Sequence, residues 1–357
     1  MKQATIADVA RRAGVSISTV SNMFNHPEKL SPDTRKAVSE AISDLGYIRN
    51  RYASALAGQK EPVFGLLVTG LDHGLPLGIA NGAYEAAKKA GFDLLIASAD
   101  NDYVINDHYI DFFQGIQMSG LILTPRPKNH WKPGYKLSVP SVITDYLGSP
   151  NDGCFVGADN IRVGVLAIKH AANLHRHHLA VVTSSDDIQT LYLRMQGMRE
   201  EIRNYPEMIL ESIDAYDWRD PKAGYEIGKQ LASRQQQDRP DFIIGMTDVL
   251  AAGVIEGILS TGCSVPEDIS VMGCDGNPMA WCGSMPLTSI VPTGFDIGVQ
   301  AVHLLLDEIN SEHHQHSTIV NPVHLLIRES TIGRQAHNDA AKNLALINSS
   351  IHQPLHR

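Results

Sequence analysis

Histidine and cysteine are among the side chains of this sequence that could hold a metal ion, and the histidines form two clusters. The clusters are His175, His177 and His178 in the segment LHRHHLA, and His313, His314 and His316 in the segment SEHHQH. Neither cluster has a carboxylate or cysteine partner at a recognised metal-binding spacing. We therefore interpret both as histidines of exposed loops, and we expect neither a metal nor a cofactor.

The cysteines are also spaced in a way that argues against metal or redox chemistry. They are Cys154, Cys263, Cys274 and Cys282, and no two of them form a Cys-x-x-Cys pair. Four reduced, partly buried thiols are the simplest interpretation. The N-terminus lacks an apolar secretion signal, and no apolar run is long enough to span a bilayer. These features together predict a cytoplasmic protein without a membrane partner.

Motifs of common enzymes are missing from the sequence. It contains no G-x-S-x-G, no phosphate-binding P-loop and no G-x-G-x-x-G after an apolar run. We therefore expect a protein that is not an enzyme, although a sugar-processing enzyme remains the alternative.

Polar side chains near the N-terminus could instead recognise DNA. Ile17, Ser18 and, one helical turn later, Asn22 stand at the beginning of an expected helix. Asparagine can pair with adenine through two hydrogen bonds, serine can bond several base edges, and isoleucine can contact a thymine methyl group. Alternatively, all three are ordinary surface residues of a helix.

Short helices must position these side chains. Thr5 and Asp8 have the spacing of a capping box, which predicts the start of a first helix that Gly14 ends. Ser16 is expected to cap a second helix that runs to about Phe24. Two helices joined by a short turn containing glycine are typical of a helix-turn-helix.

A third helix is expected from Ser31-Pro32 to Gly46, because a capping serine followed by proline is a common helix start. The inner faces of the three helices are expected to be Ile6, Val9, Ala10 and Ala13, then Val20 and Phe24, then Val38, Ala41, Ile42 and Leu45.

Charge separates this head from the rest of the chain. The chain has a net charge of −9, yet residues 1–60 hold nine of its 30 basic residues and only five of its 39 acidic ones. A basic head on an acidic body suits nucleic-acid binding through the head, although a chance fluctuation of surface charge is the alternative.

Residues 4–58 closely resemble the DNA-binding head of the lactose-repressor/galactose-repressor family of bacterial transcription regulators. The motifs that carry the resemblance are Asp8-Val9-Ala10, Ala13-Gly14-Val15-Ser16, Thr19-Val20-Ser21, Leu45-Gly46-Tyr47 and Asn50-Arg51. The resemblance implies that Ile17, Ser18 and Asn22 face the major groove. The positions that resemble phosphate-contacting or capping residues are Thr5, Ser16, Thr19, Ser21, Asn25 and Thr34.

The resemblance also implies that residues 50–58 form a hinge helix that enters the minor groove beside its counterpart from a dimer. Leu56 would be the apolar wedge between base pairs, with Ala53 beside it and Asn50 and Tyr52 as further DNA contacts.

From Pro62 onward, apolar runs alternate with helical patterns, which is typical of parallel sheets covered by helices. The runs are 63–68, 93–98, 120–125, 141–145, 179–184, 242–246 and 269–273, and a helix is expected over 80–91. The resemblance continues more loosely here, through Asp159-Asn160, Arg194-x-x-Gly197, Thr247-Asp248 and Gly273-x-Asp275. It implies an α/β body with two lobes, like periplasmic sugar-binding proteins.

We expect a head over 1–47, a hinge and linker over 48–61, and a body over 62–333 that binds an effector and forms the dimer. The first lobe would hold about 62–160 and 291–322 and the second lobe about 161–290 and 323–333, with a tail over 334–357. The tail is either disordered or a weak amphipathic helix that could join dimers into tetramers.

The residues expected to bind a small effector, by resemblance or by their place at strand ends, are Asp72, His73, Asp145, Arg194, Trp218, Thr247 and Asp275. Carboxylates and arginine suit the paired hydroxyls of a sugar, and tryptophan suits its C–H face. A salt bridge is the alternative for Arg194, and core packing is the alternative for Trp218.

The sequence therefore predicts a homodimeric regulator, most simply a repressor of carbohydrate-use genes. Its partners would be a pseudo-palindromic double-stranded operator and a small effector, expected to be a sugar. The alternative is a cytosolic sugar-binding or sugar-processing protein with an unrelated head.

Overall fold

The computed structural model describes residues 4–47, 61–71, 74–99, 103–124, 137–185, 188–277, 280 and 283–339. Contacts within the chain divide it into two compact units, Met1–Glu61 and Pro62–Arg357. In the ranges that the structure describes, no helix is both long enough and apolar enough to cross a membrane.

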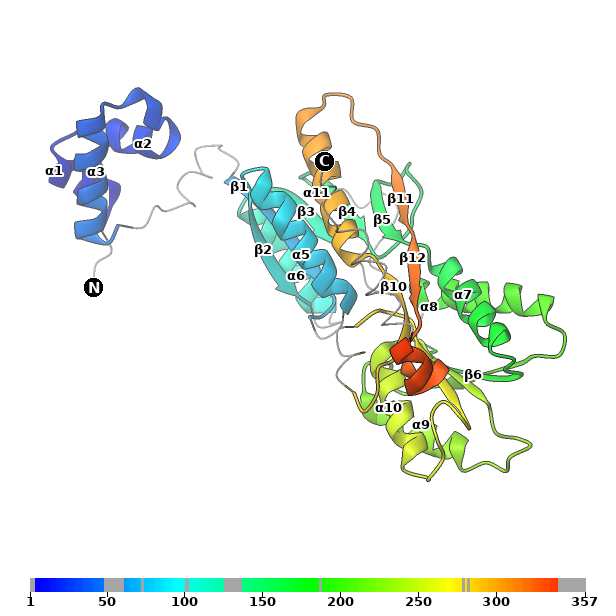
Figure 1. Ribbon diagram of the computed structural model, residues 1–357. Helices are drawn as coiled ribbons and strands as arrows, with labels where there is room; N and C mark the ends of the chain where they lie inside the picture. Colours follow the sequence, from blue (N-terminus) through cyan, green and yellow to red (C-terminus); the bar gives the residue numbers. More distant parts are fainter. Residues whose placement is uncertain are drawn as a thin grey trace, which may run out of the picture. The chain divides into compact units, whose positions relative to one another are not determined.

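The first unit is a bundle of three helices, α1 (Ile6–Ala13), α2 (Ile17–Asn25) and α3 (Pro32–Leu45), with a short 3-10 helix, η1 (Pro27–Lys29) (Figure 1). The predicted caps are confirmed. Thr5 and Asp8 form the capping box of α1, and Ser16 and Ser31 cap α2 and α3. Gly14 and Gly46 end α1 and α3 in the left-handed conformation that glycine adopts without strain.

The core of the bundle is small and comes from the predicted faces. Its buried members are Val9, Ala10, Val20, Val38 and Ala41, with Ile6, Ala13, Phe24 and Ile42 partly buried around them. The prediction for Leu45 was wrong, since its side chain stays 37% exposed. Leu45 is the last residue of α3, and helix ends are covered less than helix middles.

The second unit contains two sheets. The first sheet has the order β11-β5-β4-β3-β1-β2, and we call it with its helices the first lobe. Its strands are β1 (Glu61–Val68), β2 (Asp93–Ser98), β3 (Met118–Leu123), β4 (Ser141–Thr144), β5 (Cys154–Ala158) and β11 (Thr318–Asn321). Its helices are α5 (Gly74–Lys89), α6 (Tyr103–Gly115) and α11 (Gly294–Asn310).

The second sheet has the order β12-β10-β9-β8-β6-β7, and we call it with its helices the second lobe. Its strands are β6 (His178–Thr183), β7 (Ile209–Asp214), β8 (Phe242–Gly245), β9 (Ser270–Gly273), β10 (Thr288–Pro292) and β12 (Val323–Leu326). Its helices are α7 (Asn160–Asn173), α8 (Gln189–Glu201), η2 (Ile202–Asn204), α9 (Pro221–Ala232), α10 (Asp248–Leu259) and a last helix over 329–339.

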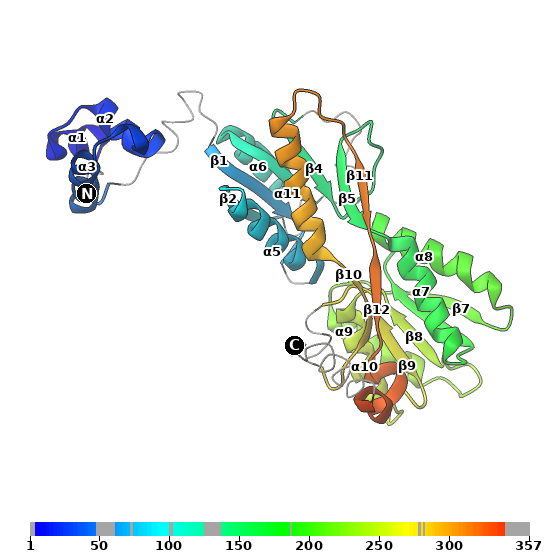
Figure 2. The same cartoon turned by 45° about the horizontal axis from the view of Figure 1, so that its top comes forward.

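Alternation along the strands explains why helices cover both faces of each sheet. In β6, Leu179 and Val181 pack in the core under α7 and α8, whereas Ala180 and Val182 pack in the core under α9 and α10. Figure 2 shows these helix pairs on opposite sides of the second sheet. Because successive side chains point to opposite faces, a strand that is buried on both faces must be apolar throughout. The α/β fold class is confirmed.

The chain passes between the lobes three times, after Ala158, after Pro292 and after Asn321. The expected crossings are near residues 160, 291 and 322. At the third crossing, β11 continues almost directly into β12, as Figures 1 and 2 show. The carboxyl ends of the parallel strands in both sheets are where ligands of such sheets usually bind.

One boundary was wrong. The helix expected over 80–91 is α5, which already begins at Gly74. Two glycines and Pro76 make residues 74–78 read as a loop, but proline is tolerated in the first turn of a helix. Gly78 serves packing, because a Cβ on it would lie only 3.1 Å from the Cα of Gly294, the first residue of α11.

Candidate DNA-binding head and effector site

The N-terminus of α2 presents a group of hydroxyls beside one exposed apolar side chain. The Ser16 hydroxyl accepts a hydrogen bond from the Thr19 backbone N–H at 3.1 Å, and it lies 2.7 Å from the Ser18 hydroxyl. Ile17 is 52% exposed, and Asn22 is half-buried one turn further along. Burial in the core therefore does not explain Ile17, and its exposure leaves it available for a groove.

Two of the predicted phosphate-contacting residues sit at helix starts. The Thr5 hydroxyl accepts from the Asp8 backbone N–H at 3.3 Å, and hydrogen bonds from Thr5 lower the pKa of Asp8. Thr34 follows the cap of α3, and its N–H donates to the Ser31 hydroxyl at 3.2 Å. Helix starts offer N–H groups and a positive dipole end to phosphates.

Several predicted contacts cannot be located in the same way. Asn50, Tyr52, Ala53 and Leu56 of the expected hinge helix lie outside the described residues, as do Asp72 and His73 of the expected effector site. Ser21 and Asn25 belong to α2, and the side chain of Asn25 lies outside the description.

In the second lobe, Asp275 follows β9 and lies against Asp248, the first residue of α10. Asp275 Oδ1 accepts from the Asp248 backbone N–H at 3.0 Å, and Asp248 Oδ1 lies 3.4 Å from the Asp275 backbone nitrogen that donates to it. The other oxygen of Asp275, Oδ2, is buried and has no hydrogen-bond partner among the described residues. Such an oxygen is costly unless a donor from elsewhere reaches it.

Asp248 differs from Asp275 because both of its oxygens are satisfied. Oδ1 accepts from the Ser289 hydroxyl at 2.7 Å, and Oδ2 accepts from the Asn277 backbone N–H at 2.7 Å. Burial, followed by the charge of Asp275, raises the pKa of Asp248 well above its usual range. Asp248 therefore organises the site, while Asp275 offers it a free acceptor.

Arg194 comes to the same place from α8. Its side chain is only 3% exposed, and it donates to Asn160 Oδ1 at 3.0 Å and to the Met246 backbone oxygen at 2.7 Å. In the part of the chain that the structure describes, Arg194 has no carboxylate within ion-pairing distance. The salt bridge considered for Arg194 is therefore not formed with a described residue. A guanidinium has five N–H donors, so others remain for a ligand.

Thr247 and Trp218 are linked to each other. The Thr247 hydroxyl caps α10 by accepting from the Leu250 N–H at 3.2 Å, and it donates to the Trp218 backbone oxygen at 2.9 Å. Trp218 is partly buried against the core under α9 and α10, and the Arg219 guanidinium lies 5.7 Å from its ring centroid. Packing against the core therefore explains part of the burial of Trp218, and its stacking on a sugar stays a prediction.

Asp145 joins the two lobes. It follows β4 of the first lobe with φ of 56°, and its Oδ1 accepts from the Thr190 hydroxyl of α8 at 3.4 Å. Two residues later, Leu147 exchanges two hydrogen bonds with the Gln189 side chain, at 2.8 and 3.0 Å. The lobes also approach each other closely at a second point, where a Cβ on Gly74 of the first lobe would lie 2.8 Å from the Asn277 Cα of the second lobe.

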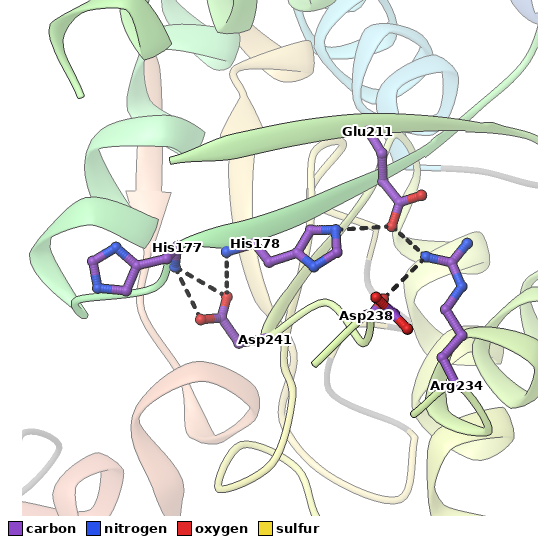
Figure 3. Close-up of polar contacts among 6 residues, drawn as sticks. All are labelled: His177, His178, Glu211, Arg234, Asp238 and Asp241. Carbon is purple, nitrogen blue, oxygen red and sulfur yellow. Dashed lines mark hydrogen bonds and ion pairs between the residues drawn. The ribbon is translucent and has the colours of Figure 1, made fainter. Parts of the chain in front are cut away.

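The histidines of LHRHHLA make structural contacts, so the interpretation of all three as exposed loop residues was partly wrong. His178 is the first residue of β6, and its Nε2 lies 3.2 Å from Glu211, which also pairs with Arg234 at 2.6 Å. The backbone N–H groups of His177 and His178 donate to Asp241, while the His177 ring points away from this network (Figure 3). His175 and His177 are exposed as expected.

The histidines of SEHHQH also differ from expectation. His313 and His316 are exposed, but the His314 side chain is only 6% exposed. Of the cysteines, Cys154, Cys263 and Cys274 are free thiols, and Cys282 lies outside the described residues. Burial raises the pKa of the Cys274 thiol to about 12, so it is protonated at neutral pH.

Two residues that contact the candidate effector residues were not proposed from the sequence, namely Asn160 and Asp248. Both stand beside residues that the sequence did single out, in the pairs Asp159-Asn160 and Thr247-Asp248. A hollow on the surface of the second lobe, between α9, α10 and Met285, is lined by none of the predicted effector residues.

Comparison with known proteins identifies both units. Residues 5–50 match the family described as bacterial regulatory proteins, lacI family, and residues 168–331 match a periplasmic binding protein-like domain. The catabolite control protein A of Priestia megaterium is 27% identical over 335 residues, which are 92% of this chain and 99% of that protein. The transcriptional repressor PurR of Aliivibrio fischeri strain MJ11 is 29% identical over 348 residues, which are 93% and 99% of the two chains.

Solved structures agree with this assignment. The Lac repressor dimer bound to operator and the anti-inducer ONPF has a TM-score of 0.78 at 25% identity, over 93% of this chain and 100% of that one. The regulator CelR in complex with cellobiose has a TM-score of 0.66 at 26% identity, over 92% and 100%. With the helix-turn-helix head and the two-lobed body both matched in one chain, this protein belongs to the lacI family of bacterial regulatory proteins and is a DNA-binding transcriptional regulator.

Proposed function

We propose that this regulator is a repressor of carbohydrate-use genes and that a sugar bound between its two lobes controls its affinity for a pseudo-palindromic operator. The observation that carries the proposal is the buried Oδ2 of Asp275, which has no hydrogen-bond partner among the described residues. A sugar hydroxyl is a donor of the right kind, and a carboxylate binds it strongly because the bond is charge-assisted.

The surroundings of Asp275 support a polyhydroxy ligand. Arg194 supplies donors and Asp275 supplies an acceptor, and both are anchored to the segment 246–248. A pocket that holds donors and acceptors side by side suits hydroxyl groups, which both donate and accept. Among similar proteins, CelR is described in complex with cellobiose, itself a polyhydroxy ligand.

Control would follow from the contacts between the lobes. Asp145–Thr190 and Leu147–Gln189 join the lobes through hydrogen bonds near the crossing after β5. A ligand that favours one arrangement of these contacts shifts the population of lobe arrangements by its difference in affinity for them. In a homodimer, that shift would decide whether two hinge segments over 50–58 can meet on one operator.

DNA binding by the intact chain to the region upstream of its own gene tests the proposal. We expect sequence-selective binding that weakens steeply as salt rises, because Lys and Arg release counterions from phosphates. Sugars would then be screened for a shift in thermal unfolding, since a ligand at 100 times its Kd stabilises by about 2.7 kcal/mol. If no sugar stabilises the protein while a purine or another small molecule does, the effector is not a sugar. The assignment of the protein as a DNA-binding regulator would not be affected by that result.

A further inference from the structure

Four potential metal ligands from separate parts of the chain meet where β5 begins, in the first lobe. Cys154 is the first residue of β5, Glu308 lies in the last turn of α11, and His314 and His316 lie in the segment that leads to β11. One ligand atom from each residue lies within 4.8 Å of all the others. This cluster is separate from the effector residues, and neither DNA binding nor effector binding uses it.

The distances suit a small tetrahedral ion. Cys154 Sγ lies 3.1 Å from His314 Nε2 and 3.5 Å from His316 Nδ1. Metal–ligand bonds of about 2.0–2.3 Å place neighbouring ligands of a tetrahedron about 3.3–3.8 Å apart. The two imidazole rings are inclined at 74° with centroids 5.2 Å apart, and a nitrogen of each lies close to Cys154 Sγ.

A carboxylate outside the four ligands orients His314. Asp307 Oδ2 lies 2.7 Å from His314 Nδ1, so it accepts the proton of that nitrogen. The lone pair of Nε2 is then directed toward Cys154. Histidines that bind metals typically donate their other ring N–H to a carboxylate in this way, which fixes the tautomer and makes the nitrogen a better ligand.

Glu308 gives independent evidence that the cluster could accept a cation. Its Oε2 is buried and has no hydrogen-bond partner within the described part of the chain. A buried carboxylate oxygen without a donor or cation is costly. A cation among the four ligands would remove this cost while also using the thiol and both imidazoles.

We propose that Cys154, Glu308, His314 and His316 form a binding site for a divalent transition metal of the zinc class. One thiolate, two imidazoles and one carboxylate form a set that zinc prefers, whereas calcium and magnesium require oxygen ligands throughout. Four protein ligands fill a tetrahedron, as in structural sites. The metal would fasten the segment 311–317 and the end of α11 to β5.

Cobalt(II) titration of the purified full-length chain tests the thiolate ligand directly. Cobalt adopts the same tetrahedral geometry, and its bond to a thiolate produces a charge-transfer absorption that histidine ligands do not produce. We expect this absorption at one cobalt per chain in the wild type and in Cys263→Ser, whose thiol lies in the second lobe and outside the cluster. Cys154→Ser should lose it.

Zinc competition against a chromophoric chelator tests the other ligands. His314→Gln and His316→Gln should weaken binding at least about tenfold, and Asp307→Asn about 10- to 100-fold through His314. His313→Gln, an exposed neighbour, should change nothing. Circular dichroism and operator binding would verify that each variant is folded.

Two results would overturn the proposal. One is the absence of a charge-transfer band in the folded wild type, which would leave the four residues as a hydrogen-bonded cluster only. The other is a zinc affinity that falls equally in His313→Gln and His314→Gln, which would assign the binding to surface histidines in general.

Discussion

Asp248 and Asp275 hold each other in place, because each carboxylate accepts a hydrogen bond from the backbone N–H of the other residue. Asp248 uses its second oxygen to bind the Asn277 N–H, whereas Asp275 Oδ2 is left buried without a described partner. These bonds fasten the residue that follows β9 to the start of α10, and they hold Asp275 Oδ2 in place as a hydrogen-bond acceptor.

The first prediction concerns that acceptor. Asp275→Asn should keep the Oδ1 bond to Asp248 but replace the charged acceptor by an N–H donor, which cannot accept a hydrogen bond from a ligand hydroxyl. Since hydrogen bonds to charged groups contribute about 1.5–3 kcal/mol, sugar affinity should fall about 10- to 100-fold in calorimetry. Operator binding without effector should persist. Glu267→Gln, an exposed change in the same lobe, is the control, and equal affinities for both variants would refute the role of Asp275.

The second prediction concerns Arg194. Arg194→Ala removes the donor to Asn160 and Met246 and the remaining donors that a ligand would use. The variant should bind operator but no longer respond to the effector, and the loss of buried hydrogen bonds should lower stability by about 1–3 kcal/mol. Arg199→Ala, an exposed position on the same helix, is the control. A full effector response by Arg194→Ala in a gel-shift titration would contradict this assignment.

The third prediction concerns Asn22 in α2. If its amide reads a base edge, Asn22→Ala should cost about 1–3 kcal/mol on the preferred operator and relax the preference at one position of each half-site. Binding would be measured on operators substituted at each position. Thr34→Ala, at a position that resembles a phosphate contact, should instead weaken all operators alike. The same uniform loss in Asn22→Ala would show that Asn22 does not read bases.

The head could be predicted closely because its signals are local. Capping residues and glycines determine where α1, α2 and α3 begin and end, and these signals lie within a few residues of each helix. In the body, apolar runs predicted β1, β2, β3, β4, β6, β8 and β9, but β5, β7, β10, β11 and β12 were not anticipated. At the edge of the second sheet, for example, β7 has the sequence ILESID with only exposed and half-buried positions, so it lacks a continuous apolar run.

Sites assembled from distant residues were harder to predict. Arg194 and Asp275 were identified through family motifs, yet their structural partners Asn160 and Asp248 act through packing between α7, α8 and α10, which no local pattern encodes. The histidines near His314 were set aside because no ligand partner stands nearby in sequence. Cys154 reaches them only because β11 pairs with β5, about 160 residues away.

The last prediction concerns His170, which ties α7 to the last helix. Its Nε2 lies 3.0 Å from the Thr331 hydroxyl, and its ring packs edge-on against Phe242. Burial lowers the pKa of His170 from 6.5 to about 4. The unfolded chain therefore binds a proton at this residue between pH 6.5 and 4 that the folded chain does not bind. The contribution of neutral, buried His170 to the free energy of unfolding is therefore complete above about pH 6.5 and is lost as pH falls toward 4.

This shift corresponds to about 3.5 kcal/mol at most, because one pKa unit is about 1.4 kcal/mol. His170→Gln should be less stable at pH 7.5, since it loses the packing on Phe242. Its stability should nevertheless fall less steeply than that of the wild type between pH 6.5 and 4.5. Denaturant unfolding at a series of pH values measures this slope, and His177→Gln, whose ring is exposed, should keep the slope of the wild type. The pH dependence of the free energy of unfolding measures proton binding, whereas its value at pH 7.5 measures the packing. An unchanged pH dependence in His170→Gln would therefore show that His170 is not the group that titrates.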